Sequence, residues 1–141
     1  MAVITLTTDL GISDSYLASV KGAIYSQLDD INIVDISNTI SPFNIHQAAY
    51  ILRNCFKDFP IGTVHLVSID DELSINNEHL AIRANGHYFV GADNGLFSLL
   101  FNNIMPDKIV RLNISLTTDF LTFSSKNIFV PAACHLARGG T

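Results

Sequence analysis

The sequence predicts an α/β fold of three layers, in which a mostly parallel sheet carries helices on both faces. Runs of β-branched and aliphatic residues alternate with segments whose apolar residues recur at helical spacing. Such strand–helix–strand alternation favours parallel pairing of the strands. Hydrophobic residues make up 48% of the 141 residues and charged residues only 15%, whereas an average soluble domain has about 25% charged residues. The chain therefore has the length of one domain and the composition of a well-buried core.

Strands and helices are predicted to alternate through the first half of the chain. The first β-rich run ends in a polar turn, and Ser13 or Asp14 is expected to be the N-cap of the helix that follows. The second helix is expected to stop before Pro60, because the residue preceding a proline disfavours the helical conformation. The expected strands are residues 3–6, 31–36 and 63–69, and the expected helices are residues 16–28 and 45–56.

The second half contains the strongest local signal, the pair Asn85 and Gly86. Both residues tolerate the positive φ that a tight hairpin requires, so the flanking runs 79–84 and 87–92 are predicted to pair as a hairpin. The remaining expected elements are a helix at residues 96–101, a strand at 108–112 and a helix at 128–137 that ends before Gly139 and Gly140.

Charge and motif content exclude several functional classes. The chain has 8 Lys and Arg against 13 Asp and Glu, a net charge of −5, which argues against binding to a nucleic-acid backbone. No apolar run approaches the roughly 20 residues of a membrane span. The N-terminus lacks the basic region of a signal peptide, so a cytoplasmic location is expected. Because the charged residues are too few to cover the surface, part of the surface is expected to be buried against another domain or subunit.

No metal or cofactor site is readable from the sequence. The two cysteines and five histidines show no ligand spacing. Glycine-rich phosphate loops, HExxH and GxSxG are absent. The chain is accordingly expected to use no cofactor and no metal.

Acidic residues expected just after the predicted strands are the candidates for chemistry, since ligands of parallel sheets bind beyond the carboxyl ends of the strands. These residues are Asp9, Asp35, Asp70 and Asp93. A carboxylate accepts two hydrogen bonds side by side, so Asp9 and Asp14 together suit a vicinal diol such as a ribose. The structural alternative is that Asp14 caps the helix and Asp9 fixes the turn.

The order of motifs resembles a known family. Residues 5–11 (TLTTDLG), 14–16 (DSY) and 20–24 (VKGAI) are similar to the opening of the S-adenosylmethionine hydroxide adenosyltransferases, relatives of fluorinase and chlorinase. The resemblance continues in order over nearly the whole chain, through residues 33–37 (IVDIS), 40–45 (ISPFNI), 48–52 (AAYIL), 59–65 (FPIGTVH), 92–96 (ADNGL) and 131–137 (PAACHLA).

The resemblance implies an enzyme that hydrolyses S-adenosylmethionine to adenosine and methionine. It implies a homotrimer of two-domain subunits, with each site between the first domain of one subunit and the second domain of its neighbour. Residues 1–141 would be the N-terminal domain, and a β-rich second domain is expected to be missing from this chain. Asp9 and Asp14 match the acidic pair near the ribose, and Phe43 matches an aromatic residue lining the adenosine site. Tyr16 and Asn94 fall in motifs close to the pocket.

The catalytic motifs depart from the family pattern. Asp70 matches the aspartate of an Asp, Arg and His set that activates water, but Asn77 stands at the Arg position and Ser124 at the His position. The alternative function is therefore a nucleoside- or S-adenosylmethionine-binding protein without turnover. Halogenation is disfavoured although Ser125 falls at a halide-contacting serine, because the acidic run at residues 70–72 would repel an incoming anion.

Overall fold

The computed structural model describes residues 2–13, 15–42, 44–69, 79–102, 104–112 and 129–139. Every predicted strand and helix has a counterpart in it, with ends that differ by a few residues at most. The strands are β1 (Ala2–Thr8), β2 (Ile31–Ser37), β3 (Val64–Ser68), β4 (His79–Ala84), β5 (His87–Ala92) and β6 (Lys108–Arg111). The helices are α1 (Tyr16–Gln27), α2 (Ile45–Cys55), the short 3-10 helix η1 (Phe56–Asp58), α3 (Leu96–Leu100) and α4 (Val130–Ala137).

The six strands form one sheet in the order β2-β1-β3-β5-β4-β6. The pairs β1–β2, β1–β3 and β3–β5 are parallel, whereas β4 runs antiparallel to both β5 and β6. The helices α1 and α2 connect the parallel strands β1, β2 and β3, as the alternation in the sequence predicts. The antiparallel part arises from the β4–β5 hairpin.

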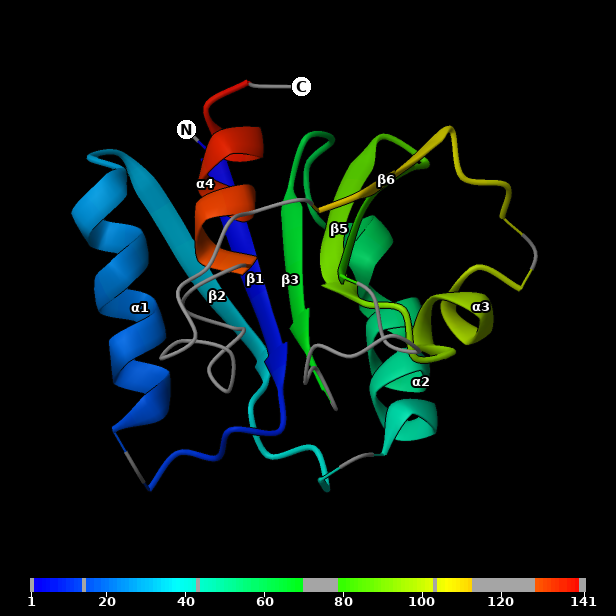
Figure 1. The fold of residues 1–141 in the computed structure, drawn as a ribbon, viewed down its shortest axis with the longest axis horizontal. Coiled ribbons are helices and arrows are strands. Elements are labelled where there is room, and N and C mark those ends of the chain that lie inside the picture. Colours follow the sequence, from blue (N-terminus) through cyan, green and yellow to red (C-terminus); the bar gives the residue numbers. More distant parts are fainter. Residues whose placement is uncertain are drawn as a thin grey trace.

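Helices cover both faces of the sheet, which confirms the three-layer α/β prediction (Figure 1). On one face, Ile4 and Leu6 of β1 pack with Val20 and Ile24 of α1 and with residues of α4. On the other face, residues of β3 and β5 pack with α2, η1 and α3. Two cores result, because successive side chains of a strand point to opposite faces.

The hairpin is confirmed in detail. Asn85 has φ 54° and Gly86 has φ 80°, the positive values of a two-residue turn whose twist matches the flanking strands. Ala84 pairs with His87 directly beyond the turn.

Two helix starts differ from the sequence prediction. The N-cap of α1 is Ser15, since its carbonyl accepts the hydrogen bond of Ser19 N–H, so the predicted cap at Ser13 or Asp14 is wrong. The α-helix α4 begins at Val130, with Pro131 in its first turn. Proline suits that place because its missing N–H would be unpaired there anyway. The predicted first residue of this helix, Ile128, lies outside the described residues.

A pair of histidines lies inside the second core. His65 Nδ1 is 2.7 Å from Thr5 Oγ1, and His65 Nε2 is 3.2 Å from His87 Nδ1. The His65 ring stacks on Phe89 at a centroid distance of 4.9 Å, and Phe56 meets both imidazoles edge-on. Burial, with a smaller contribution from His87, lowers the pKa of His65 to about 3, and burial also lowers the pKa of His87. Both rings are therefore neutral at neutral pH.

Candidate functional site

The carboxyl ends of β1, β2, β3 and β5 meet at one edge of the sheet, the lower edge in Figure 1. This edge carries the loops that follow the strands, and with them Asp9, Asn38, Asp93 and Asn94. Three of the predicted site residues, Asp14, Phe43 and Asp70, lie outside the described residues, as do Asn77, Ser124 and Ser125.

A buried hydrogen-bond network joins the loops after β1 and β2. Thr8 Oγ1 donates to Asn38 Oδ1 at 2.8 Å and accepts from Leu10 N at 3.2 Å. Gly11 N donates to the carbonyl of Asn38 at 2.7 Å, and Ile40 N donates to the carbonyl of Thr8 at 3.3 Å. Asn38, which is only 5% exposed, therefore holds the chain on either side of Asp9 in place. Asn38 is not among the predicted site residues, although it directly follows the last residue of β2.

Asp35 belongs to this network. It lies within β2, whose last residue is Ser37, so its predicted position after the strand is wrong. Its carboxylate accepts from Lys21 Nζ at 2.7 Å and from Asn38 Nδ2 at 2.9 Å. Burial alone would raise the pKa of Asp35, but these two hydrogen bonds and the Lys21 charge together outweigh burial and hold the pKa below its ordinary value. The ionised carboxylate thus links α1 to the loop that follows β2.

Asp9 lies where β1 leaves the sheet. Its backbone N–H donates to the Ser68 carbonyl of β3 at 3.2 Å, and its side chain is half-buried. The turn that follows passes through Gly11 at φ 80°, a conformation that glycine adopts without strain. Tyr16, the first residue of α1, is 51% exposed. The described geometry thus fixes the backbone that presents Asp9 and leaves Tyr16 at the surface.

Asn94 fixes the loop after β5. Its Nδ2 donates to the Ile69 carbonyl at 2.7 Å, and its Oδ1 accepts from Leu96 N at 3.2 Å. Gly95, at φ 94°, completes the tight connection into α3. Asn94 is therefore at the predicted edge, where it links the end of β3 to the start of α3.

A buried threonine hydroxyl also lies near this edge. Thr7 is fully buried and pairs in register with Ser37 and Val67. Among the residues that the structure describes, none hydrogen-bonds to Thr7 Oγ1. A buried hydroxyl of this kind is costly unless it is satisfied, and Thr7 is two residues before Asp9 in the chain.

The described residues supply no metal site and no membrane span. No group of three or more His, Cys, Asp or Glu side chains gathers among them in a way that could hold a metal ion. None of the helices in the described part of the chain is both long and apolar enough to cross a bilayer. Cys55 and Cys134 are free thiols whose pKa values burial raises.

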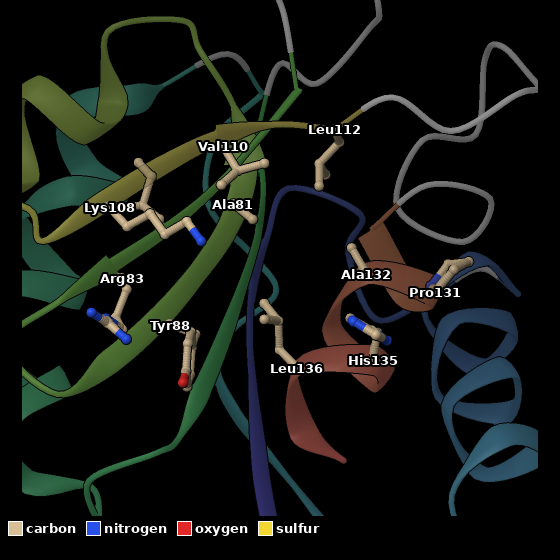
Figure 2. Close-up of a pocket in the computed structure, with 11 residues that line it drawn as sticks. Ala81, Arg83, Tyr88, Lys108, Val110, Leu112, Pro131, Ala132, His135 and Leu136 are labelled. Carbon is tan, nitrogen blue, oxygen red and sulfur yellow. The ribbon is translucent and has the colours of Figure 1, made fainter. Parts of the chain in front are cut away.

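A cavity lies away from this edge. A groove of about 390 Å³ runs between the β4–β6 part of the sheet and α4, and Figure 2 shows the side chains that line it. Of the predicted site residues that the structure describes, Asp9, Tyr16 and Asn94, none lines it.

Comparison with known proteins covers almost the entire chain. Residues 4–141 match the family described as SAM hydroxide adenosyltransferase N-terminal domain. An (R)-S-adenosyl-L-methionine hydrolase of Methanocaldococcus jannaschii is 33% identical over 132 residues, which are 90% of this chain and 50% of that protein. A fluorinase of Nocardia brasiliensis is 37% identical over 62 residues, 44% of this chain and 21% of that enzyme.

The fold is shared with solved structures. An uncharacterized conserved protein from Thermotoga maritima superposes with a TM-score of 0.87 at 28% identity, over 98% of this chain and 55% of that one. The chain thus spans about half the length of the hydrolases that it matches over nearly all its residues.

Proposed function

Because the chain belongs to the SAM hydroxide adenosyltransferase N-terminal domain family, we propose that it contributes to the hydrolysis of S-adenosylmethionine to adenosine and methionine. The match over residues 4–141 carries the proposal, and the ordered loop that presents Asp9 supports it. The hydrolases that it resembles are about twice as long. The proposed active protein therefore has a second, β-rich domain and assembles as a homotrimer, in which a neighbouring subunit completes each site.

In the proposed mechanism, Asp9 and Asp14 accept hydrogen bonds from the two ribose hydroxyls and so fix the adenosine moiety. Phe43 lines the adenosine site, and Tyr16 and Asn94 border it. Asp70 accepts a proton from water as the water oxygen forms a bond to C5′. The C5′–S bond breaks, and its electron pair stays on the sulfur of methionine. No metal or further cofactor takes part.

The electrostatics of this step favour a pocket of low polarity. The substrate sulfonium is a cation, and it becomes a neutral thioether as the nucleophile attacks. Charge separation therefore decreases on the way to the transition state. A site with little water favours this transition state more than bulk water does. The harder task is the activation of water, for which a general base contributes roughly 10²–10⁴-fold.

A second function has a specific observation in its favour. Asn77 and Ser124 replace the arginine and histidine that the family resemblance implies beside Asp70. Neither replacement can carry a positive charge, so the orientation and charge balance of the water site are altered. Binding of nucleoside or S-adenosylmethionine without turnover is the alternative proposal.

Chromatography of the full-length protein incubated with S-adenosylmethionine separates the two functions. Hydrolysis predicts adenosine above the buffer rate, and Asp70→Asn is expected to lower that rate by about 10²-fold or more through loss of the base. Asp58→Asn, an exposed aspartate of η1, is the matched control and should leave the rate unchanged. Saturable binding without adenosine formation would support the alternative, and absence of both binding and turnover would contradict both functions.

A further inference from the structure

The groove beside α4 has the composition of a ligand site that the proposed hydrolysis does not use. One wall is the face of β4, β5 and β6 that no described helix covers fully, and the other wall is α4 (Figure 2). Tyr88 occupies the second position of β5, so this end of the groove lies toward the start of that strand, whereas Asp93 and Asn94 follow its end. The polar end of the groove and the candidate nucleoside site are therefore at opposite ends of β5.

The strand register places polar residues side by side in one row of the groove wall and apolar residues in the next row. Arg83 of β4 is directly opposite Tyr88 of β5 on one side and Lys108 of β6 on the other. Two residues along, Ala81 pairs with Val110. Residues two apart on a strand share a face and lie about 7 Å apart. The groove thus has a cationic and phenolic end and, about 7 Å away, an apolar floor.

The two cations at the polar end are poorly matched by carboxylates. Arg83 Nε is 3.9 Å from Asp107 Oδ2, at the limit of an ion pair between exposed groups. For Lys108, the described residues provide no ion-pair partner. Like charges directly opposite each other on neighbouring strands are destabilising, and here they occur in a chain of net charge −5. An anion between them would relieve this repulsion.

The apolar part continues onto the helix. Leu136 of α4 points toward the sheet across the groove (Figure 2), and Pro131, Ala132 and His135 of the same helix also line it. Ala81 and Ala132 are small, which leaves room for an occupant between the two walls.

The size of the groove favours a small molecule over a protein as its occupant. Its volume of about 390 Å³ falls within the roughly 300–1,000 Å³ typical of small-molecule sites. Eleven of the described residues line it, whereas a stable protein interface uses about 20–30 residues on each side.

We propose that this groove binds a small amphipathic carboxylate. Its carboxylate lies between Arg83 and Lys108, within reach of the Tyr88 hydroxyl, and its apolar tail lies over Ala81 and Val110 against Leu136. The two positively charged donors provide charge-assisted hydrogen bonds, which are stronger than neutral ones. The site requires no part of the nucleoside-binding edge, so the inference stands independently of the proposed hydrolysis.

The test is calorimetric titration of the purified full-length protein with sodium octanoate and, separately, with 1-octanol, which has a similar tail and no charge. We expect saturable one-to-one binding of octanoate. Arg83→Gln combined with Lys108→Gln should weaken octanoate by about tenfold or more, because the charge-assisted hydrogen bonds to its carboxylate are lost, and should leave octanol unaffected. Arg53→Gln combined with Lys57→Gln removes two exposed cations outside the groove and should change neither affinity.

A groove-filling variant, Ala132→Phe, should weaken both ligands, and circular dichroism establishes that each variant is folded. The proposal would be overturned if octanoate showed no saturable binding or if octanol bound as tightly as octanoate. It would also be overturned if Arg83→Gln combined with Lys108→Gln left octanoate binding unchanged, or if this variant and the control variant affected octanoate equally. Sedimentation of the unliganded protein tests whether another copy of the chain fills the groove. If Ala132→Phe dissociates an oligomer, a second copy occupies the groove and the proposal is overturned.

Discussion

The environment of His65 shows how a single residue can set the pH dependence of the whole fold. Its imidazole has hydrogen-bond contacts with Thr5 and His87 and is enclosed by Phe56, Phe59 and Phe89. The other charged groups on the elements around it, Lys57 and Asp58 of η1, are exposed. A proton added to either imidazole would therefore place an uncompensated charge in an apolar core.

The sign of the resulting pH dependence follows from the depressed pKa. The pKa of His65 is lowered from 6.5 to about 3 on folding, so the unfolded chain binds the proton more readily. The contribution to stability is fully present above pH 6.5 and is lost progressively as pH falls toward 3. We expect the free energy of unfolding, measured by urea denaturation, to decrease from pH 6.5 to pH 5.

His65→Gln should flatten this decrease, because glutamine retains hydrogen-bonding groups but does not titrate. The exposed His46 on α2 provides the control, and His46→Gln should keep the slope of the wild type. An unchanged slope in His65→Gln would show that other groups govern the acid response. The range above pH 5 is chosen because Asp35, whose pKa is below its ordinary value, does not titrate there.

Residue by residue, the candidate site could be predicted from the sequence only in part. Asp9 and Asn94 lie at the strand ends where the motifs placed them, and Asp35 does not, because β2 runs to Ser37. The role of Asn38 depends on contacts with Thr8 and Gly11, which lie about thirty positions earlier in the chain. Contacts of that range leave no local pattern that periodicity could detect.

At the scale of elements, the sequence predicts an element well where the backbone conformation restricts the residue types that can occupy it. The hairpin is such a case, because two consecutive positive φ angles restrict the residue types at its turn. The sheet order β2-β1-β3-β5-β4-β6 is the opposite case, since the alternation predicts parallel pairing but does not assign neighbours. The close approach at Gly91, where an added Cβ would be 2.7 Å from the Val67 carbonyl oxygen, likewise depends on which strands are adjacent.

Two glycines provide a direct test of the turn. Gly86 has φ 80°, and an added Cβ would lie 3.2 Å from Ile61 Cγ2, whereas Gly22 in α1 has ordinary helical geometry and open space around it. Gly86→Ala should destabilise the protein by about 1–2 kcal/mol, because left-handed backbone is costly for alanine.

Gly22→Ala should instead stabilise the protein by about 0.5–1 kcal/mol through the higher helix propensity of alanine. Thermal unfolding of the two variants beside the wild type measures both effects. Equal shifts of Tm in the same direction would contradict the assignment of the turn and the helix.

At the scale of the whole molecule, the sheet separates two chemical environments. The carboxyl edge combines Asp9 with a rigid support of buried polar groups, and the face beside α4 combines cations with an apolar floor. The low charge content suggested that part of the surface is covered by another domain or subunit. The hydrolases that the chain matches are about twice as long as this chain.

The central claim is that Asp9 and Asp14 hold the ribose hydroxyls of an adenosine moiety. Calorimetric titration of the full-length protein with adenosine, before and after the double substitution Asp9→Ala and Asp14→Ala, tests it most directly. Two carboxylates that accept hydroxyl hydrogen bonds predict a loss of affinity of about 10²-fold or more, since each hydrogen bond to a charged group contributes about 1.5–3 kcal/mol. The preference for adenosine over 2′,3′-dideoxyadenosine should disappear with it. Unchanged adenosine affinity in a folded double variant would contradict the claim.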